Sequence, residues 1–375
     1  GNMSTEFPKP HLSEAQAREL VERVFGLRVD SLRPLPSYDD QNFHVAESGG
    51  GEYVLKIMNS ADSHNSGLIE VQTHTMMFLR ECGLPTSSVA RTQRGETMSL
   101  ETIDCGSGSK GYIVRLLTYL PGTPVAKIPS TPQILYEVGR MAAMLNRALL
   151  KMEHPQLQSL KRENFFWSLY SVPLIESYLF VMDGDPIQHV VRNVIQLYKR
   201  QIQPRLGSFR QCILHGDFND HNILIEPDGP AEGALISSEG QQLQKRYRIS
   251  GILDFGDMSW GCLVFEVAIT IMYMMIESQT PMEVGGPVLA GYESVTPLTE
   301  EERDVVFLLV LCRFCQSLVR ARHTVLQDPE NEEYLMITSR KGGTLLAQLW
   351  EMGKEVVERL WFDSARSYQS SRTGV

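Results

Sequence analysis

One short polar segment lies between two apolar runs at residues 212–226, with the sequence CILHGDFNDHNILIE. The two flanks have the composition of buried strands, whereas the residues between them include His215, Asp217 and Asn222. A polar loop held between two buried segments presents reactive groups at a fixed geometry. We therefore take this loop as the first candidate for chemistry.

A second acidic group follows a later apolar run, in SGILDFGDMSWG, where Asp254 precedes Phe255 and Gly256. The two apolar runs are expected to be antiparallel strands whose ends carry Asp217, Asn222 and Asp254. A carboxylate and an amide from different strands can share a hard divalent cation, and the other carboxylate then remains free as a base. Phosphoryl transfer needs this set, because a metal neutralises phosphate charge and a carboxylate accepts a hydroxyl proton.

A lysine in the first third of the chain supplies a further group. Lys56 lies in the apolar run YVLKI, where a buried ammonium must find an anion. Phosphate is one such anion and a helix glutamate is another, and kinase-like folds use both.

The elements that must position these residues fall into two parts. Residues 1–120 combine a first helix, with Ser13 and Gln16 as a capping box, and a series of strand-like runs. Beyond Pro121 and Gly122, which are typical of a hinge, the pattern is helical except for one β-like island at residues 213–255. We expect an α+β, bilobal protein, with a β-rich N-terminal lobe at residues 1–120 and a larger, mainly helical lobe at residues 121–375. A cleft between two such lobes would be the ligand site.

Three other segments have simple structural interpretations. The spacing of Gly106, Gly108 and Gly111 matches a dinucleotide fingerprint, but strand-forming residues follow it, so a hairpin turn is expected. Cys312 and Cys315 lie in a helical, apolar pattern and are expected to be buried thiols. The Gly- and Ser-rich segment at residues 227–246 predicts a long mobile hairpin loop.

Composition excludes several classes of function. The chain has 375 residues and a net charge of −10, which argues against a nucleic-acid-binding protein and is compatible with a small amino ligand. The most apolar segment, at residues 261–278, contains Glu266 and predicts a core helix and no membrane span. The six cysteines form no disulfide framework and no secretory signal is visible, so we expect a cytoplasmic protein.

The motifs V-L-K, H-G-D-x-x-x-x-N and D-F-G occur here in the order that resembles the aminoglycoside phosphotransferase and choline kinase-like family, over residues of about 35–350. The resemblance implies a protein-kinase-like fold that binds Mg²⁺ and a nucleoside triphosphate. It implies that Asp217 is the catalytic base, that Asn222 and Asp254 hold Mg²⁺, and that Lys56 contacts the phosphates. His215 would brace the loop without reacting.

The same resemblance assigns further nucleotide-binding residues. Thr118, Tyr119 and Leu120 would form the hinge that reads the purine, and SYDDQNF at residues 37–43 would cover the phosphates. A glutamate on the next helix should pair with Lys56. Glu70 and Gln72 are the candidates, and they lie about 200° apart around a helix, so we choose Glu70 because a buried ammonium favours a charge.

Several neighbours of these motifs carry two interpretations. Asp257 could hold metal or cap the following helix, and capping is preferred. Asp220 and His221 could form a solvated loop face or line the substrate site. Glu266 is expected to bond to the backbone near the catalytic loop, and Arg313 is a candidate, together with the RENFFW segment at residues 162–167, for binding a substrate carboxylate.

Within the family, the runs LPSYDDQNFHV, HGDFNDHNILIE and ILDFGDMSWG most closely resemble members that transfer phosphate from GTP to the hydroxyl of 5-hydroxy-L-lysine. That resemblance implies a small-molecule kinase with GTP as donor, ATP being possible. Gly216 stands where regulated protein kinases carry Arg, which also favours a small acceptor. Two alternatives remain: a kinase for another acceptor (choline, homoserine, methylthioribose or an amino sugar), and a kinase-like binding protein without catalysis, for which a base would be superfluous.

Overall fold

The computed structural model describes residues 9–37, 39–229, 245–327 and 329–373. The chain divides into two compact units. The first contains the described residues up to Pro121 together with Met152–Leu160, and the second contains Gly122–Lys151 and the described residues from Lys161 onward. The sequence had placed Met152–Leu160 in the C-terminal lobe, but its 3₁₀ turn packs against a helix of the first unit.

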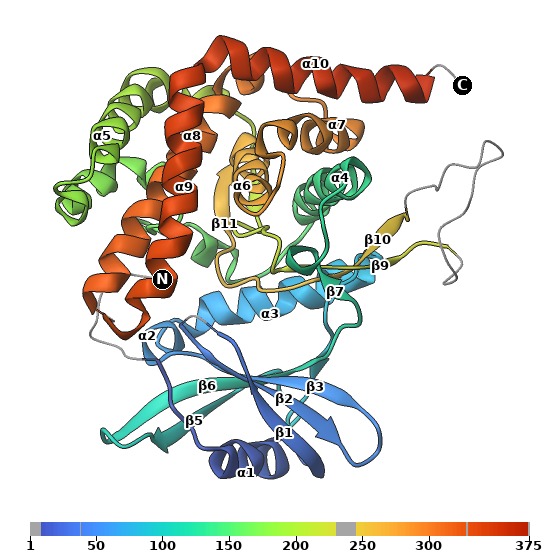
Figure 1. Cartoon of the computed structure of the whole chain (residues 1–375). Coiled ribbons are helices and arrows are strands. Elements are labelled where there is room, and N and C mark those ends of the chain that lie inside the picture. The colour runs from blue at the N-terminus through green and yellow to red at the C-terminus, as the bar shows by residue number, and fades with distance from the viewer. Residues whose placement is uncertain (1–8, 38, 230–244, 328, 374–375) are drawn as a thin grey trace. The chain divides into compact units, whose positions relative to one another are not determined.

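The first unit is a six-stranded antiparallel sheet in the order β1-β2-β3-β6-β4, with β5 paired to β6 and helices beside it (Figure 1). Its elements are α1 (Glu14–Phe25), β1 (Val29–Leu35), β2 (Gln41–Glu47), β3 (Glu52–Ile57), α2 (Ser60–Ser63), α3 (Ser66–Glu81), β4 (Val89–Ala90), β5 (Ser99–Asp104), β6 (Ser109–Thr118) and η2 (Leu157–Leu160).

Local signals set the boundaries of these elements. Ser13 and Gln16 form the expected capping box of α1, and Gly26 ends the helix in the left-handed region at φ 70°. The glycine-rich run after residue 105 connects β5 to β6 as a hairpin, so the interpretation as a turn and not a dinucleotide fingerprint is confirmed.

The sheet of the first unit has two different faces. Leu55 and Ile57 of β3 belong to the apolar core that α1 covers. Since side chains alternate along a strand, Lys56 points to the opposite face. There β3 pairs with β6 so that Lys56 lies directly across from Arg115, and Arg115 donates to Thr73 Oγ1 of α3 at 2.8 Å.

The second unit is mainly helical and contains two small antiparallel sheets, β10-β9-β7 and β11-β8. Its strands are β7 (Thr123–Pro124), β8 (Gln211–Leu214), β9 (Ile223–Pro227), β10 (Tyr247–Ile252) and β11 (Ser259–Cys262). Its helices are α4 (Pro132–Leu149), α5 (Ile187–Leu197), α6 (Leu263–Ile276), α7 (Gly285–Val295), α8 (Glu300–Gln327), α9 (Glu332–Met352) and α10 (Lys354–Thr373). Shorter helical segments are η1 (Val125–Lys127), η3 (Leu169–Met182), η4 (Tyr198–Ile202), η5 (Gln203–Ser208), η6 (Pro281–Glu283) and η7 (Pro329–Asn331).

Helix α6 is the buried centre of this unit, and α8 packs along it. Cys312 and Cys315 of α8 are fully buried free thiols, as expected. None of the helices in the described ranges is long and apolar enough to cross a membrane. The predicted hairpin is present as the pair β9 and β10, although most of its connecting loop, residues 230–244, lies outside the described residues.

Candidate active site

The polar loop at residues 215–222 connects β8 to β9, and a buried carboxylate holds its first turn in place. Glu266 of α6 is fully buried. Its Oε2 accepts from the His215 backbone N–H at 2.7 Å and from Asn146 Nδ2 at 2.9 Å, and its Oε1 accepts from the Gly216 N–H at 3.1 Å. Tyr292 donates to Asn146 Oδ1 at 2.7 Å. The expected role of Glu266 is therefore confirmed, because a charged acceptor binds backbone N–H groups strongly.

The imidazole of His215 links this loop to the chain that leads into the D-F-G segment. Its Nδ1 accepts from the Asp217 N–H at 3.2 Å, and its Nε2 lies 2.8 Å from the Leu253 carbonyl oxygen. A neutral ring with its proton on Nε2 satisfies both contacts. Both nitrogens are thus occupied by the backbone, which is the bracing role expected for His215.

Gly216 has a conformation and surroundings that exclude a side chain. Its φ is 83°, and a Cβ atom there would lie 2.4 Å from the Asp257 carbonyl oxygen. The Gly216 carbonyl accepts from Arg313 Nη2 at 2.9 Å. The close approach of two loop backbones explains why this position carries glycine.

Arg313 of α8 is fully buried beneath the loop. Besides Gly216, its guanidinium donates to the Trp167 carbonyl and to Gln316 Oε1, and it lies 4.8 Å from the Trp167 ring centre. The sequence had suggested that Arg313 binds a substrate carboxylate. Its Nη1 and Nη2 donors instead bind backbone carbonyls and a neighbouring side chain, so in this structure it braces the loop.

Asp217 and Asn222 are in direct contact. Asn222 Nδ2 donates to the Asp217 backbone oxygen at 2.9 Å and to Asp217 Oδ2 at 3.2 Å, and Asn219 Nδ2 donates to Asp217 Oδ1 at 2.9 Å. Each carboxylate oxygen of Asp217 is therefore oriented by one amide. The part played by Asn219 was not predicted from the sequence, where its position two residues after Asp217 was the only signal.

Asp254 follows the strand end that pairs with Asn222. The Leu253 N–H donates to the Asn222 carbonyl at 2.8 Å, and Ile252 pairs with Ile223 in the β10-β9 ladder. Asp254 itself has a φ of 57°, unusual for a residue with a side chain. Its Oδ1 accepts from the Gly256 N–H at 3.1 Å, which fixes the carboxylate in the turn. The D-F-G segment is held further by Arg162, which donates to the Gly256 carbonyl at 3.0 Å.

The electrostatic environment of Asp217 opposes its ionisation. Burial raises the pKa of Asp217 well above its usual range, and the negative charges of Asp257 and Asp254 raise it further, while Arg313 and the Asn219 hydrogen bond lower it. Three carboxylates are therefore close enough to interact, and Arg313 is the cation that acts on Asp217. Because three carboxylates face one arginine, the site favours an added cation.

The structure decides between the alternative roles of Asp257, Asp220 and His221. Helix α6 has Cys262 as its N-cap, without a side-chain cap bond, so the capping interpretation of Asp257 is wrong. Asp220 is 7% exposed and its Oδ2 has no hydrogen-bond partner in the described part of the chain. Burial raises the pKa of Asp220, while His221 lowers it. His221 is exposed, so the solvated face includes His221 but not Asp220.

Lys56 belongs to the first unit, and its ion pair differs from the expected one. Lys56 Nζ lies 3.7 Å from Asp40 Oδ2, and the two side chains are 12% and 15% exposed. Glu70 is exposed on α3, whereas Gln72 is buried at 2%. The ion pair chosen from the sequence, Lys56 with Glu70, is thus not the one the structure forms.

The predicted purine hinge lies at the end of β6. The Thr118 N–H donates to the Ser88 carbonyl at 2.9 Å and the Tyr119 N–H donates to the Glu52 carbonyl at 3.0 Å. Both N–H groups are therefore used within the sheet. A purine edge at Thr118, Tyr119 and Leu120 would have to use their carbonyls or the Leu120 N–H.

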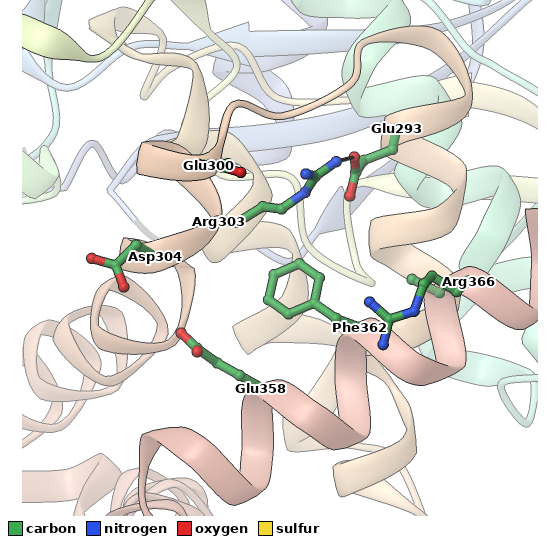
Figure 2. Close-up of a pocket in the computed structure, with 8 residues that line it drawn as sticks. Glu293, Glu300, Arg303, Asp304, Glu358, Phe362 and Arg366 are labelled. Carbon is green, nitrogen blue, oxygen red and sulfur yellow. Dashed lines mark hydrogen bonds and ion pairs between the residues drawn. The ribbon is translucent and has the colours of Figure 1, made fainter.

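A separate cavity of about 440 Å³ lies in the second unit among α7, α8 and α10 (Figure 2). Two of its acidic groups are paired with arginines: Glu293 Oε2 accepts from Arg303 at 2.6 Å, and Asp304 accepts from Arg205 at 2.8 Å. None of the predicted site residues lines this cavity, so we do not assign it to the candidate site.

Among the described residues, no group of three or more His, Cys, Asp or Glu side chains could hold a metal.

Known proteins resemble this chain over its whole length. It is 59% identical to a hydroxylysine kinase of Danio rerio, covering 98% of this chain and 99% of the relative. It is 55% identical to a hydroxylysine kinase of Bos taurus, with 99% and 98% coverage. Among solved structures, a microcompartment-associated aminopropanol kinase gives a TM-score of 0.65 at 16% identity, covering 93% of this chain and 100% of that one. An amicoumacin kinase in complex with AMP-PNP and Ca²⁺ gives 0.63 at 13% identity, with 89% and 94% coverage.

The structural matches show the fold, and the sequence matches show the family. The sequence profile of the Phosphotransferase enzyme family matches residues 31–236, which is more than half of the chain. The resemblance inferred from V-L-K, H-G-D-x-x-x-x-N and D-F-G is therefore confirmed, as is the α+β kinase-like fold. On this ground the chain belongs to the phosphotransferase enzyme family and is itself a phosphotransferase.

Proposed function

We propose that this protein is a small-molecule kinase that transfers the γ-phosphate of GTP to the side-chain hydroxyl of 5-hydroxy-L-lysine. The chemistry depends on one observation, the Asp217 carboxylate held by Asn222 at 3.2 Å and by Asn219 at 2.9 Å. The choice of acceptor is supported by full-length relatives named hydroxylysine kinase, at 49–59% identity.

Asp217 is proposed as the base. As the acceptor oxygen forms its bond to the γ-phosphorus, the bond from phosphorus to the bridging oxygen breaks and the nucleoside diphosphate leaves. The hydroxyl proton passes to Asp217. The raised pKa of Asp217 makes its carboxylate a stronger base than an ordinary aspartate while it remains ionised.

Asn222 and Asp254 are proposed to hold Mg²⁺, which when bound would neutralise phosphate charge. The residues fit this ion. Asn222 uses its Nδ2 on Asp217, so the same side chain presents its Oδ1 as an oxygen ligand. Mg²⁺ commonly takes only one or two protein ligands and completes its shell with water and phosphate. The excess negative charge around Asp217 also favours a cation.

The nucleotide is proposed to contact Lys56 through its phosphates and residues 118–120 through its purine. GTP is preferred as donor on the resemblance alone, with ATP as the alternative.

A reducing, cytoplasmic setting agrees with six cysteines that are all free thiols.

The test is a panel of hydroxyl acceptors, each assayed with GTP and with ATP for release of nucleoside diphosphate. We expect 5-hydroxy-L-lysine with GTP to give the highest kcat/KM. Turnover of choline, homoserine or an amino sugar in its place would refute the acceptor. In parallel, Asp217→Asn should reduce kcat by at least about 10³-fold and still bind nucleotide. Normal turnover by that variant would remove Asp217 from its role.

A further inference from the structure

The face of the first sheet that carries Lys56 holds two cations side by side. Lys56 and Arg115 are directly opposite in the β3-β6 pair, and their side chains are mostly buried, Arg115 at 2% exposure. Opposite residues of an antiparallel pair have Cβ atoms about 5 Å apart. Two like charges in this position destabilise the sheet unless an anion compensates them. The acidic residue that pairs with Lys56 must therefore be identified.

Helix α3, which lies on this face, does not supply the anion to Lys56. Glu70, the glutamate of α3 that was expected to pair with Lys56, is exposed. Its buried residues are neutral, and Thr73 is the α3 group that accepts from Arg115. Among the ion pairs of the described residues, the partner of Lys56 is Asp40 at 3.7 Å.

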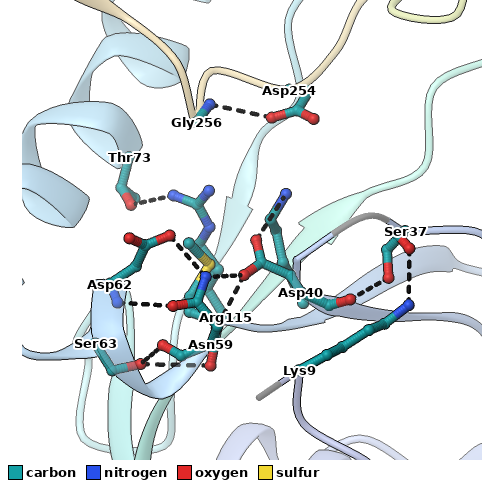
Figure 3. A network of polar contacts seen from close by, with 12 residues as sticks. Lys9, Ser37, Asp40, Asn59, Asp62, Ser63, Thr73, Arg115, Asp254 and Gly256 are labelled. Carbon is teal, nitrogen blue, oxygen red and sulfur yellow. Dashed lines mark hydrogen bonds and ion pairs between the residues drawn. The ribbon is translucent and has the colours of Figure 1, made fainter. Parts of the chain in front are cut away.

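The Asp40 carboxylate is fixed by Asn59, which lies two residues beyond the end of the strand that carries the lysine. Its Oδ1 accepts from the Asn59 backbone N–H at 2.9 Å and from Asn59 Nδ2 at 3.1 Å. Asn59 is 7% exposed and caps α2 by accepting from the Asp62 N–H at 2.8 Å. Figure 3 shows Asp40, Asn59 and Asp62 as one polar network. Two hydrogen bonds from Asn59 therefore hold Asp40 beside Lys56.

We propose that Asp40 is the positioning residue for Lys56 and takes the part that a helix glutamate would otherwise play. Its carboxylate holds the ammonium in one orientation, in which Lys56 meets the nucleotide phosphates. This inference rests on the proposed function, because it assumes that Lys56 binds phosphate. It assigns the counter-ion to Asp40, directly before β2, and not to α3.

The experiment compares Asp40→Asn with Asp40→Glu and with Asp30→Asn, a matched control on exposed β1. Asparagine at position 40 keeps the Oδ1 acceptor for Asn59, and it removes the charge beside Lys56 by replacing Oδ2 with an NH₂ group. We expect Asp40→Asn to lower kcat/KM for the nucleotide by about 10- to 100-fold with the acceptor KM within about twofold. Asp40→Glu should recover part of the loss, and Asp30→Asn should match the wild type.

A double-mutant cycle shows whether Asp40 acts through Lys56. Binding of a fluorescent GTP analogue is measured for Asp40→Asn, for Lys56→Met and for the double variant. If the proposal holds, Asp40→Asn weakens binding in the wild-type background and has no further effect in Lys56→Met. An equal loss in both backgrounds overturns it, as does tighter binding by Asp40→Asn, which would make Asp40 a competitor of phosphate.

One further variant separates the two candidate counter-ions. A loss in Glu70→Gln that exceeds the loss in Asp40→Asn would return the role to α3 and overturn the proposal. These results are distinct from failure of the proposed function. A wild type inactive on every acceptor would reject the kinase assignment, whereas an active wild type with an unaffected Asp40→Asn rejects only the role of Asp40.

Discussion

Glu266→Gln is the most informative single change, because Glu266 is buried, touches no proposed substrate and holds the loop that carries Asp217. Glutamine preserves the shape and replaces one oxygen by an NH₂ group. If the amide oxygen occupies the Oε2 position, the bonds from His215 and Asn146 remain. The NH₂ group then faces the Gly216 N–H, which now bonds to Oε1 at 3.1 Å, and two donors oppose each other.

The magnitude follows from these three bonds. A hydrogen bond to a buried charged group contributes about 1.5–3 kcal/mol, and one is lost outright. The other two become neutral bonds of about half the strength. Removing a buried charge offsets part of this loss. We expect the free energy of unfolding to fall by about 3 kcal/mol, which for a protein of this size lowers the Tm by about 4 °C.

The kinetic consequence is larger than the loss of stability suggests. Displacement of the Gly216 peptide moves Asp217, the next residue, and a misplacement of about 1 Å can cost about 100-fold in rate. We expect kcat to fall by about 10- to 100-fold at temperatures where the variant is folded. Thermal unfolding and steady-state assays with saturating nucleotide measure the two effects.

Glu277→Gln is the matched control. Glu277 lies at the end of the same helix and forms an exposed ion pair with Lys341 at 3.2 Å, with side chains 47% and 51% exposed. Such a pair contributes about 0–1 kcal/mol, so the Tm of this variant should change by less than about 2 °C. The reasoning is refuted if Glu266→Gln is as stable and as active as Glu277→Gln.

Two other predictions concern the same loop. Gly216→Ala should lose about 2–4 kcal/mol and most activity, because its Cβ would meet the Asp257 carbonyl oxygen at 2.4 Å. Gly184 has a similar φ of 85° with nothing within 4 Å. In thermal unfolding, Gly184→Ala should therefore lose only the stability that the unfavourable backbone conformation costs, without the cost of a steric clash. Asp257→Asn removes a charge that raises the pKa of Asp217, so the acid limb of kcat/KM should move to lower pH. Because the base must be ionised, activity is lost as pH falls through this pKa, and an unchanged or upward-shifted limb would contradict the assignment.

Much of the framework was predictable because its signals are local. The capping box of Ser13 and Gln16 is read within a few residues and is present, and Gly26 ends the same helix. The glycine-rich turn before β6 was separated from a dinucleotide fingerprint by the residues that follow it. The H-G-D-x-x-x-x-N spacing placed Asp217 and Asn222 in one loop between two strands, but their direct hydrogen bond was not predicted.

The polar contacts between distant residues were predicted less well. Asn146 lies on the buried face of α4 but gives no sequence sign that it would donate to Glu266, 120 residues away. Asp257 was assigned to a helix cap, but the helix starts later, at Leu263. Arg313 was one candidate for binding a substrate carboxylate, but it is fully buried and donates to the backbone carbonyls of Gly216 and Trp167.

The sequence by itself determined that one part of the chain is rich in strands and the other is mainly helical. It also determined the order of the motifs and the residues able to take part in phosphoryl transfer. These properties depend on periodicity and on residue type. Only the tertiary structure decided which groups pair. Glu70 and Gln72 differ by two positions on one helix, and the packing of α3 exposes the first and buries the second. Asp40 reaches Lys56 across sixteen residues because the β2-β3 pairing brings the two segments together. A charge pair of this kind depends on strand register and helix rotation, which are set by the whole core and not by the residues that form the pair.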